Sequence, residues 1–327
     1  MERKLAETKL YIVVPCYNEE EVISDSYKKL SEKLNRLIAE KKAAKESRII
    51  FVNDGSRDET YDILLDICEN DGACGMISFS KNYGHQNAIL AGMLYSMEDA
   101  DAVITIDADL QQDIEAIDDF LLKYSEGCEI VYGVRNDRKS DGFLKKVTAK
   151  AFYGLMKCLG CDVRENSADY RLLSKKAVEA LGGFEESNLF LRGLIPLMGF
   201  KSGVVHFDVK PREAGKSKYS VGKMFTLALD GITSLSIRPI RIITAIGGLM
   251  CLFSLVMIVL SIIEWFLDLS IKGYSTTVIS IWLVGGVVML SQGILGEYIG
   301  KMYFETKKRP RYIVETVIWP GSDKPED

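Results

Sequence analysis

The stretch L-Y-I-V-V-P-C-Y-N-E-E at residues 10–20 begins with an unbroken apolar run and ends in amide and acidic side chains. Such a run is typical of a buried strand, and the amphipathic pattern after it predicts a helix over 20–42. The same order repeats along the chain, with strands predicted at 48–53, 75–79, 102–107 and 129–133 and helices at 60–70, 86–97 and 114–124. This alternation predicts an α/β domain with a doubly wound, mostly parallel sheet and right-handed crossovers.

Polar side chains follow the predicted strands where each of them ends. The segments are P-C-Y-N-E-E (15–20), N-D-G-S-R-D (53–58), S-K-N-Y-G-H (80–85) and D-A-D-L-Q (107–111). Because ligands of such sheets bind at the carboxyl ends of the strands, this edge is the predicted binding site. The sequence lacks the G-x-G-x-x-G that a Rossmann dehydrogenase carries after its first strand, which argues against a nicotinamide enzyme.

Asp107 and Asp109 are candidate metal ligands. Residues i and i+2 of an extended segment point the same way, so both carboxylates can face one ligand. Hard oxygen ligands suit Mg²⁺ or Mn²⁺, which commonly share their remaining positions with phosphates and water. An acidic turn without a metal is the alternative. Asp54 can accept hydrogen bonds from a base or ribose, or it can form an Asx-turn with Gly55.

Two apolar stretches near the C-terminus, 242–263 and 276–296, contain no Asp, Glu, Lys or Arg. At about 1.5 Å of rise per residue, a helix of this length covers the roughly 30 Å hydrocarbon core of a bilayer. The sequence therefore predicts a two-helix transmembrane hairpin with a short connector at 264–275. Two buried helices of a large soluble domain are the alternative, although such helices rarely stay uncharged for this long.

The charges suggest how the chain is oriented in a membrane. A net charge of −5 argues against general nucleic-acid binding. Lys and Arg nevertheless cluster within 210–241 and 301–311, on both outer sides of the apolar stretches. The positive-inside rule then places both flanks and both termini in the cytoplasm and only the connector outside. The first residues are charged and offer no secretory signal, so the globular part is expected to be cytoplasmic.

The segment 219–237 has the pattern of an amphipathic helix and could lie in the membrane interface. An ordinary helix packed on the globular domain is the alternative. The expected organisation is a cytoplasmic α/β domain at 1–218, a juxtamembrane helix at 219–241, the hairpin at 242–296 and a cytoplasmic tail at 297–327.

The motifs V-V-P-C-Y-N-E-E, V-N-D-G-S-R-D-E-T and D-A-D-L-Q, in this order and spacing, resemble the GT-A glycosyltransferases of family 2. The likeness extends through S-K-N-Y-G-H-Q (80–86), A-D-Y-R-L-L-S (168–174) and R-E-A-G-K-S-K-Y-S (212–220). This set is similar to the polyprenyl-phosphate branch, which includes dolichol-phosphate mannose synthase and bacterial undecaprenyl-phosphate glucosyltransferases with a C-terminal hairpin. The resemblance implies a GT-A fold and covers nearly the whole chain.

The resemblance also implies roles for individual residues. The nucleotide-sugar pocket would be lined by Pro15, Tyr17, Glu19 and Asp107, with Asp54 on the uracil or ribose side. The metal on the diphosphate would be held by Asp107, Asp109 and Gln111. Asp169 matches the acidic residue proposed as the catalytic base, and Asp109 belongs with it to the catalytic set. The phosphates of donor or acceptor would meet Arg135, Arg171, Arg212 and Lys218.

The implied reaction is an inverting transfer of a sugar from a UDP-sugar to undecaprenyl phosphate at the cytoplasmic face of a bacterial membrane. The product, a polyprenyl-phosphate-linked sugar, would serve cell-envelope glycan modification. Glucose is the expected sugar, while UDP-N-acetylglucosamine, UDP-galactose and GDP-mannose remain open as donors. A lipid phosphate is largely dianionic at neutral pH, so Asp169 is expected to orient as much as to abstract a proton. Relatives suggest a homo-oligomer, such as a tetramer.

Two other classes of protein share parts of this pattern. A processive polysaccharide synthase needs a Q-x-x-R-W segment and more spans, and the sequence contains neither. A catalytically dead membrane adaptor would be expected to lose metal or nucleotide residues, whereas Asp54, Asp107, Asp109 and Asp169 are all present. An active transferase is therefore the expectation.

Overall fold

The computed structural model of the chain describes residues 3–136, 167–186, 189–208 and 274–320, together with single positions between 240 and 256. These residues fall into two units, of which the first contains the sheet and residues 310–320 and the second contains helix α10 (Tyr274–Thr306). The predictions for Arg212, Lys218, the helix at 219–241 and most of the apolar stretch 242–263 concern residues outside the described part.

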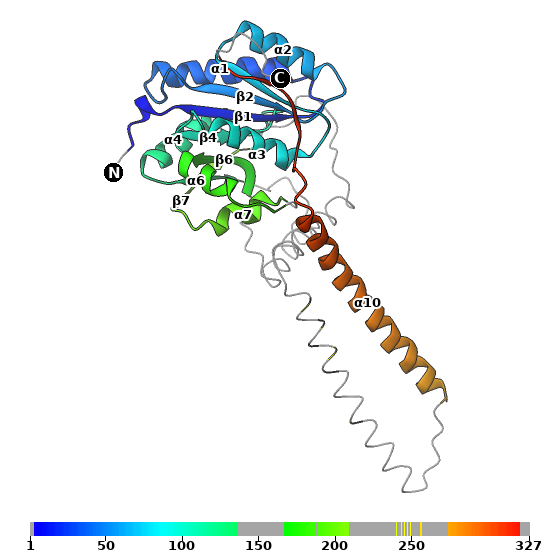
Figure 1. Cartoon of the computed structure of the whole chain (residues 1–327). Coiled ribbons are helices and arrows are strands. Elements are labelled where there is room, and N and C mark those ends of the chain that lie inside the picture. The colour runs from blue at the N-terminus through cyan, green and yellow to red at the C-terminus, as the bar shows by residue number, and fades with distance from the viewer. Residues whose placement is uncertain are drawn as a thin grey trace. The chain divides into compact units, whose positions relative to one another are not determined.

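Four parallel strands form the centre of the sheet (Figure 1). They are β1 (Leu10–Cys16), β2 (Arg48–Asn53), β3 (Cys74–Phe79) and β4 (Ala102–Thr105), in the spatial order β3-β2-β1-β4. Every residue of β1, β3 and β4 is buried, which explains why these strands read as unbroken apolar runs rather than as alternating patterns. The predicted strands in this part of the chain are confirmed.

Helices cover both faces of this central sheet. One hydrophobic core joins the sheet to α1 (Ile23–Ala39), α2 (Thr60–Asn70) and α4 (Ile117–Ser125), the last of which directly follows the 3₁₀ turn η2 (Ile114–Ala116). Helix α3 (His85–Ser96) packs on the opposite side of β1 and β2 and contacts α6 (Lys175–Gly182). A short 3₁₀ turn, η1 (Leu5–Glu7), precedes β1. The predicted helices at 60–70 and 86–97 agree with α2 and α3 to within one residue.

The predicted parallel pairing is interrupted by one antiparallel strand within the sheet, which makes the sheet mixed. Strand β6 (Ser167–Ser174) lies between β4 and β5 (Ile130–Arg135) and runs antiparallel to both of them. Strand β7 (Ser202–Phe207) then pairs in parallel with β5. Thr105 at the end of β4 pairs with Arg171, so the first residues of β6 lie at the carboxyl edge of the parallel strands.

The opposite end of the sheet is completed by β8 (Val314–Ile318), which pairs antiparallel with β3. The ring of Tyr312 stacks on Phe79 with 4.9 Å between centroids, and Trp319 Nε1 donates to Asp99 Oδ2 at 3.2 Å. These contacts add to the backbone ladder. The sequence predicts a tail at 297–327, whereas the structure makes residues 314–318 of it part of the sheet.

Helix α10 extends past the predicted end of the second apolar stretch at residue 296. In the part of the chain that the structure describes, no helix reaches the combination of length and apolar character that a membrane crossing requires.

Helix α3 packs so closely on the sheet that position 92 has room only for a glycine. A Cβ atom built on Gly92 would be 2.3 Å from Val13 Cγ1 and 2.9 Å from Val52 Cγ2. Neither valine can move aside easily, since β-branched side chains have few rotamers. Gly92 therefore fixes the depth at which α3 packs, and with it the position of the residues at the start of this helix.

We predict that Gly92→Ala destabilises the protein by about 1–3 kcal/mol, the usual cost of overpacking a core. The measurement is the thermal unfolding midpoint of the purified full chain. Gly72→Ala is the matched control, because a Cβ built there meets no atom within 4 Å. Equal midpoints for the two variants would contradict the close packing of α3.

Candidate active site

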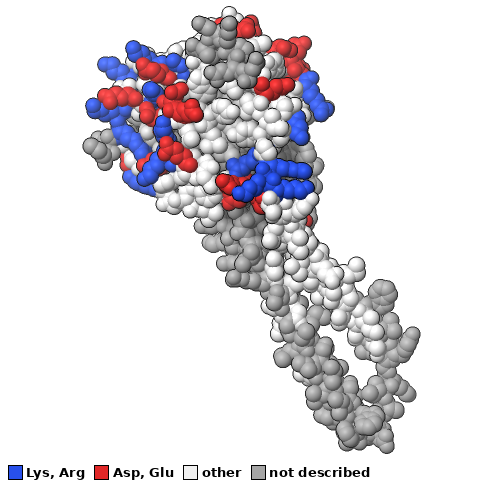
Figure 2. All heavy atoms as spheres, in the orientation of Figure 1, with Lys and Arg blue, Asp and Glu red and all other residues white. Residues whose placement is uncertain are grey.

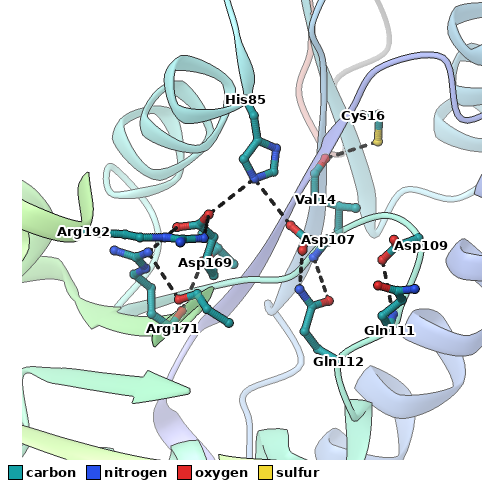
Figure 3. A network of polar contacts seen from close by, with 12 residues as sticks. Val14, Cys16, His85, Asp107, Asp109, Gln111, Gln112, Asp169, Arg171 and Arg192 are labelled. Carbon is teal, nitrogen blue, oxygen red and sulfur yellow. Dashed lines mark hydrogen bonds and ion pairs between the residues drawn. The ribbon is translucent and has the colours of Figure 1, made fainter. Parts of the chain in front are cut away.

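The loop after β4 presents Asp107 and Asp109 at the edge of the sheet (Figure 3). The Asp107 backbone N–H donates to Gln112 Oε1 at 3.2 Å, and Gln112 Nε2 donates to the Asp107 carboxylate. The Asp109 carboxylate accepts the Gln111 backbone N–H at 3.2 Å. Gln112 is buried, so its amide holds Asp107 from the side of the protein interior. One third of the Asp107 side chain stays exposed.

Helix α1 supports this loop from the side of the core. The buried Ser26 hydroxyl donates to the Ala108 carbonyl at 2.5 Å, between the two aspartates. Further along α1, the buried Lys33 ammonium pairs with Glu115 at 2.6 Å and with Asp118. Both carboxylates belong to the segment that follows the loop, so α1 restrains the loop itself and the segment after it.

Asp169 reaches the same edge from β6. Its backbone carbonyl accepts a hydrogen bond from Thr105 Oγ1 at 2.6 Å, which ties it to the last residue of β4. Its carboxylate accepts from Arg171, two residues further along β6. It also pairs with Arg192, because Arg192 Nε lies 3.2 Å from Oδ1 and Nη2 lies 2.8 Å from Oδ2. Arg192 comes from α7 (Leu191–Leu197).

His85 connects the two acidic positions. Its Nε2 lies 3.5 Å from Asp107 Oδ1 and 3.9 Å from Asp169 Oδ2 (Figure 3). His85 is the first residue of α3, which Gly92 allows to lie close to β1 and β2. Asp107, His85 and Asp169 therefore form a continuous polar group although they come from three different elements.

The two carboxyl groups of this polar group differ in their electrostatics. Burial raises the pKa of Asp107, and the charges of Asp169 and Asp109 raise it further against the lowering effect of His85. Burial would also raise the pKa of Asp169, but the Arg192 and Arg171 guanidinium groups outweigh it and hold that pKa well below its usual range. The negative charge of Asp169 is thus balanced by two arginine side chains. The Asp107 carboxylate lies near two other carboxylates, and a positive charge next to it would be stabilised.

The donor set around Asp107 is suitable for a hard divalent cation. Among the described residues, no three or more His, Cys, Asp or Glu side chains gather in a way that could hold a metal ion. Asp107 and Asp109 nevertheless stand on one loop with the Gln111 amide, and all three provide oxygen ligands. Mg²⁺ and Mn²⁺ are commonly bound by one or two carboxylates together with substrate phosphates and water. The residues present therefore fit the predicted cation.

Asp54 organises the loops after β2 and β3. It is buried, and its carboxylate accepts the backbone N–H groups of Tyr83 at 2.6 Å and Gly84 at 2.9 Å. Burial raises the pKa of Asp54, while these two hydrogen bonds lower it. Gly55 has a φ of +62°, and a Cβ there would lie 2.3 Å from the Lys81 carbonyl carbon. Only glycine lets the two loops approach this closely.

The loop after β1 is hydrogen-bonded to the segment that follows β2. The Asn18 backbone N–H donates to Ser56 Oγ at 3.0 Å, and the Glu19 backbone N–H donates to Thr60 Oγ1 at 2.9 Å. Pro15 is buried within β1, while Tyr17 and Glu19 are half-buried at the strand end. The structure thus brings the residues that are predicted to bind the nucleotide to one edge of the sheet.

The remaining predicted residues differ in how they relate to the polar group of Asp107, His85 and Asp169. Arg135 is exposed at the end of β5. Arg171 is 0% exposed and donates to Asp169 and, at 3.3 Å, to the Ala168 carbonyl, so its contact with a phosphate stays a prediction. Gln112, rather than the predicted Gln111, contacts Asp107.

Gln112 and Arg192 are two residues of this group that the sequence does not predict. Gln112 stands next to a predicted ligand in D-L-Q-Q, so an amide at either position could have been considered. Arg192 has no such signal, because it lies in a helix 23 residues from its partner and outside every recognised motif.

Comparison with known proteins shows to which protein family the chain belongs. The model of the family described as Glycosyl transferase family 2 matches residues 11–182. The uncharacterized glycosyltransferase YkoT of Bacillus subtilis (strain 168) is 46% identical over 317 residues, covering 97% of this chain and 94% of the relative. The prophage bactoprenol glucosyl transferase homolog of Escherichia coli (strain K12) is 38% identical and covers 94% of this chain and 99% of the relative. The bactoprenol glucosyl transferase of Shigella phage SfX is also 38% identical, with the same coverage. The chain therefore belongs to glycosyl transferase family 2.

Proposed function

We propose that this glycosyltransferase moves a sugar, with glucose as the first choice, from a UDP-sugar to a polyprenyl phosphate such as undecaprenyl phosphate. The observation that carries the proposal is the polar group at the sheet edge, where His85 stands between Asp107 and Asp169 at 3.5 and 3.9 Å. The names of the relatives that are 38% identical support the bactoprenol acceptor and the glucosyl group. The product would carry sugar to cell-envelope glycans.

On the donor side, the loops after β1, β2 and β3 would hold the nucleotide. Asp54 would face the uracil or ribose and already fixes the backbone of Tyr83 and Gly84. Pro15, Tyr17 and Glu19 would line the pocket from the end of β1. The hydrogen bonds between these loops support a preformed pocket, which lowers the ordering cost of binding.

The transfer itself is a single displacement. An oxygen of the acceptor phosphate bonds to the anomeric carbon as the bond from that carbon to the UDP oxygen breaks, so an α-linked donor gives a β-linked lipid phosphate. Asp107, Asp109 and Gln111 would hold Mg²⁺ or Mn²⁺, and such a cation spreads the charge that develops on the leaving diphosphate.

Asp169 would contribute charge and orientation rather than proton abstraction. Both of its carboxylate oxygens accept from arginine side chains, and its pKa is held well below the usual range. An acceptor phosphate with a second pKa near 6 is largely dianionic at neutral pH and needs little help from a base. Arg135, Arg212 and Lys218 would meet the phosphates of donor or acceptor.

We also propose that residues 242–296 anchor the enzyme as a two-span hairpin in the bacterial cytoplasmic membrane, with the catalytic domain and both termini in the cytoplasm. Residues 274–296 carry no charged side chain, and the described atoms of this stretch are white in Figure 2. Large apolar side chains on α10 are exposed, among them Ile281 at 65% and Met289 at 75%. The segment 219–241 would lie in the interface, and a homo-oligomer such as a tetramer would complete the assembly.

We predict that Asp109→Ala abolishes sugar transfer while the protein stays folded and membrane-bound. The physical reason is the loss of one of two carboxylates that would hold the cation on the diphosphate. The measurement is the formation of sugar–lipid phosphate by the purified full chain with undecaprenyl phosphate, Mg²⁺ or Mn²⁺ and a panel of UDP-glucose, UDP-N-acetylglucosamine, UDP-galactose and GDP-mannose.

Asp62→Ala is the matched control, because Asp62 is exposed on α2 and its loss changes the net charge equally. Full activity of Asp109→Ala with Mg²⁺ or Mn²⁺ present would contradict the cation site. A parent chain that leaves all four donors unreacted would instead support a membrane adaptor.

We predict that only the connector between the two apolar stretches reaches the outside of the cell. An impermeant thiol reagent added to intact cells should label a cysteine placed at Ser270, whereas a cysteine at Ser322 should react only after permeabilisation. The chain without added cysteines is the control; Cys16, Cys68, Cys74 and Cys128 are buried in it. Labelling in the reverse order would overturn the proposed orientation.

A further inference from the structure

Arg192 is a residue of the site to which the reaction described above gives no role beyond its charge. Its Nε and Nη2 lie 3.2 and 2.8 Å from the two carboxylate oxygens of Asp169. Such a two-point pairing fixes the orientation of a carboxylate in addition to its charge. We propose that Arg192 is a positioning residue that holds Asp169 at the reaction centre, and that Gln86 in turn positions Arg192. This inference rests on the proposed transfer reaction.

Gln86 connects the start of α3 to the start of α7. Its Oε1 accepts the backbone N–H of Leu191 at 2.8 Å, and Arg192 is the next residue along the chain. The first N–H groups of a helix lack partners within the helix, so this bond provides one for α7. Leu191 and Ile195 are 0% exposed and anchor the same helix in the core. The backbone that carries Arg192 is therefore held at a fixed place.

The start of α3 thus contacts the site twice. His85 faces Asp107 and Asp169, while the next residue, Gln86, holds α7. Gly92 lets α3 pack closely on β1 and β2, so the position of α3 is fixed relative to the sheet. Both contacts start from this helix and are therefore fixed relative to the sheet as well. Arg192 and Asp107 are in this way placed relative to each other through a single helix.

Arg171 does not replace Arg192 in this arrangement. Arg171 donates to Asp169 Oδ1, whereas Oδ2 pairs with Arg192 at 2.8 Å and lies 3.9 Å from His85 (Figure 3). Without Arg192, Oδ2 would keep His85 as a neighbour but would also face the Asp107 carboxylate, which repels it. The carboxylate is then expected to turn away from the reaction centre.

We predict that Arg192→Ala lowers kcat by roughly 10- to 100-fold, since a displacement of about 1 Å at a reaction centre can cost that much. The KM for the UDP-sugar should stay the same, because the proposed donor pocket is formed by the loops after β1, β2 and β3. Arg192→Lys should recover only part of the loss, since an ammonium group cannot bond both oxygens in the same fork. Added guanidinium should raise the kcat of Arg192→Ala, because the Arg192 side chain is 35% exposed.

Gln86 offers an independent variant that leaves both charges of the pair intact. Gln86→Leu removes the acceptor for the Leu191 N–H and should lower kcat with unchanged donor KM. Gln86→Glu keeps an oxygen at this position and should retain more of the kcat than Gln86→Leu.

Arg48→Ala is the matched control for the loss of an arginine, because Arg48 begins β2 at the other edge of the sheet and bonds to the Lys45 and Ser47 carbonyls. Its kcat should equal that of the parent. An unchanged kcat in Arg192→Ala would overturn the proposal. So would a loss of kcat that guanidinium does not reverse and that accompanies a lowered thermal midpoint, which would mark a structural role.

Failure of the proposed reaction gives a different result, since the parent chain itself would then form no sugar–lipid phosphate. Crystal structures of the parent and Arg192→Ala decide the positioning role in that case. The expected difference is an Asp169 carboxylate turned away from His85 in the variant. An Asp169 that superposes in the two structures would overturn the inference.

Discussion

Asp169 reaches the polar group at the sheet edge because β6 runs opposite to β4. The carboxyl ends of β1, β2, β3 and β4 share one edge of the sheet, so the segments after them bring Asp54, His85 and Asp107 together there. A parallel strand in the place of β6 would put its first residues at the other edge. The reversed direction instead pairs Thr105 with Arg171 and lets the Thr105 hydroxyl bond to the Asp169 carbonyl.

The site then separates two carboxyl groups by their surroundings. Asp169 is compensated by Arg171 and Arg192, and its pKa falls well below the usual range. Burial of Asp107 raises its pKa, and the nearby charges of Asp169 and Asp109 raise it further. The charge of Asp169 is therefore balanced by arginines within the protein, whereas the surroundings of Asp107 on balance disfavour its negative charge. This difference is what the proposed cation site next to Asp107 rests on.

The sequence predicted the parts of the fold that depend on local pattern. The apolar runs of β1 to β4 are buried on both faces, and each ends in polar residues that mark the binding edge. The direction of β6 was not predictable, because parallel and antiparallel pairing leave the same apolar signal in a short strand. Arg192 was missed for a related reason, because its role comes from a contact with a residue 23 positions away and leaves no local signal. For Gln112 the local sequence offers two neighbouring amides, and only the fold decides which of them contacts Asp107.

Strand β8 has a consequence for the order in which the protein is made. Its residues follow α10 in the chain, yet they pair with β3, whose residues are synthesised more than two hundred positions earlier. Until the ribosome has made the last part of the chain, the outer edge of β3 lacks its ladder partner, and open strand edges invite association with other chains. The apolar stretches therefore leave the ribosome while the sheet is still unfinished, and folding of the sheet is completed only after α10 has been made.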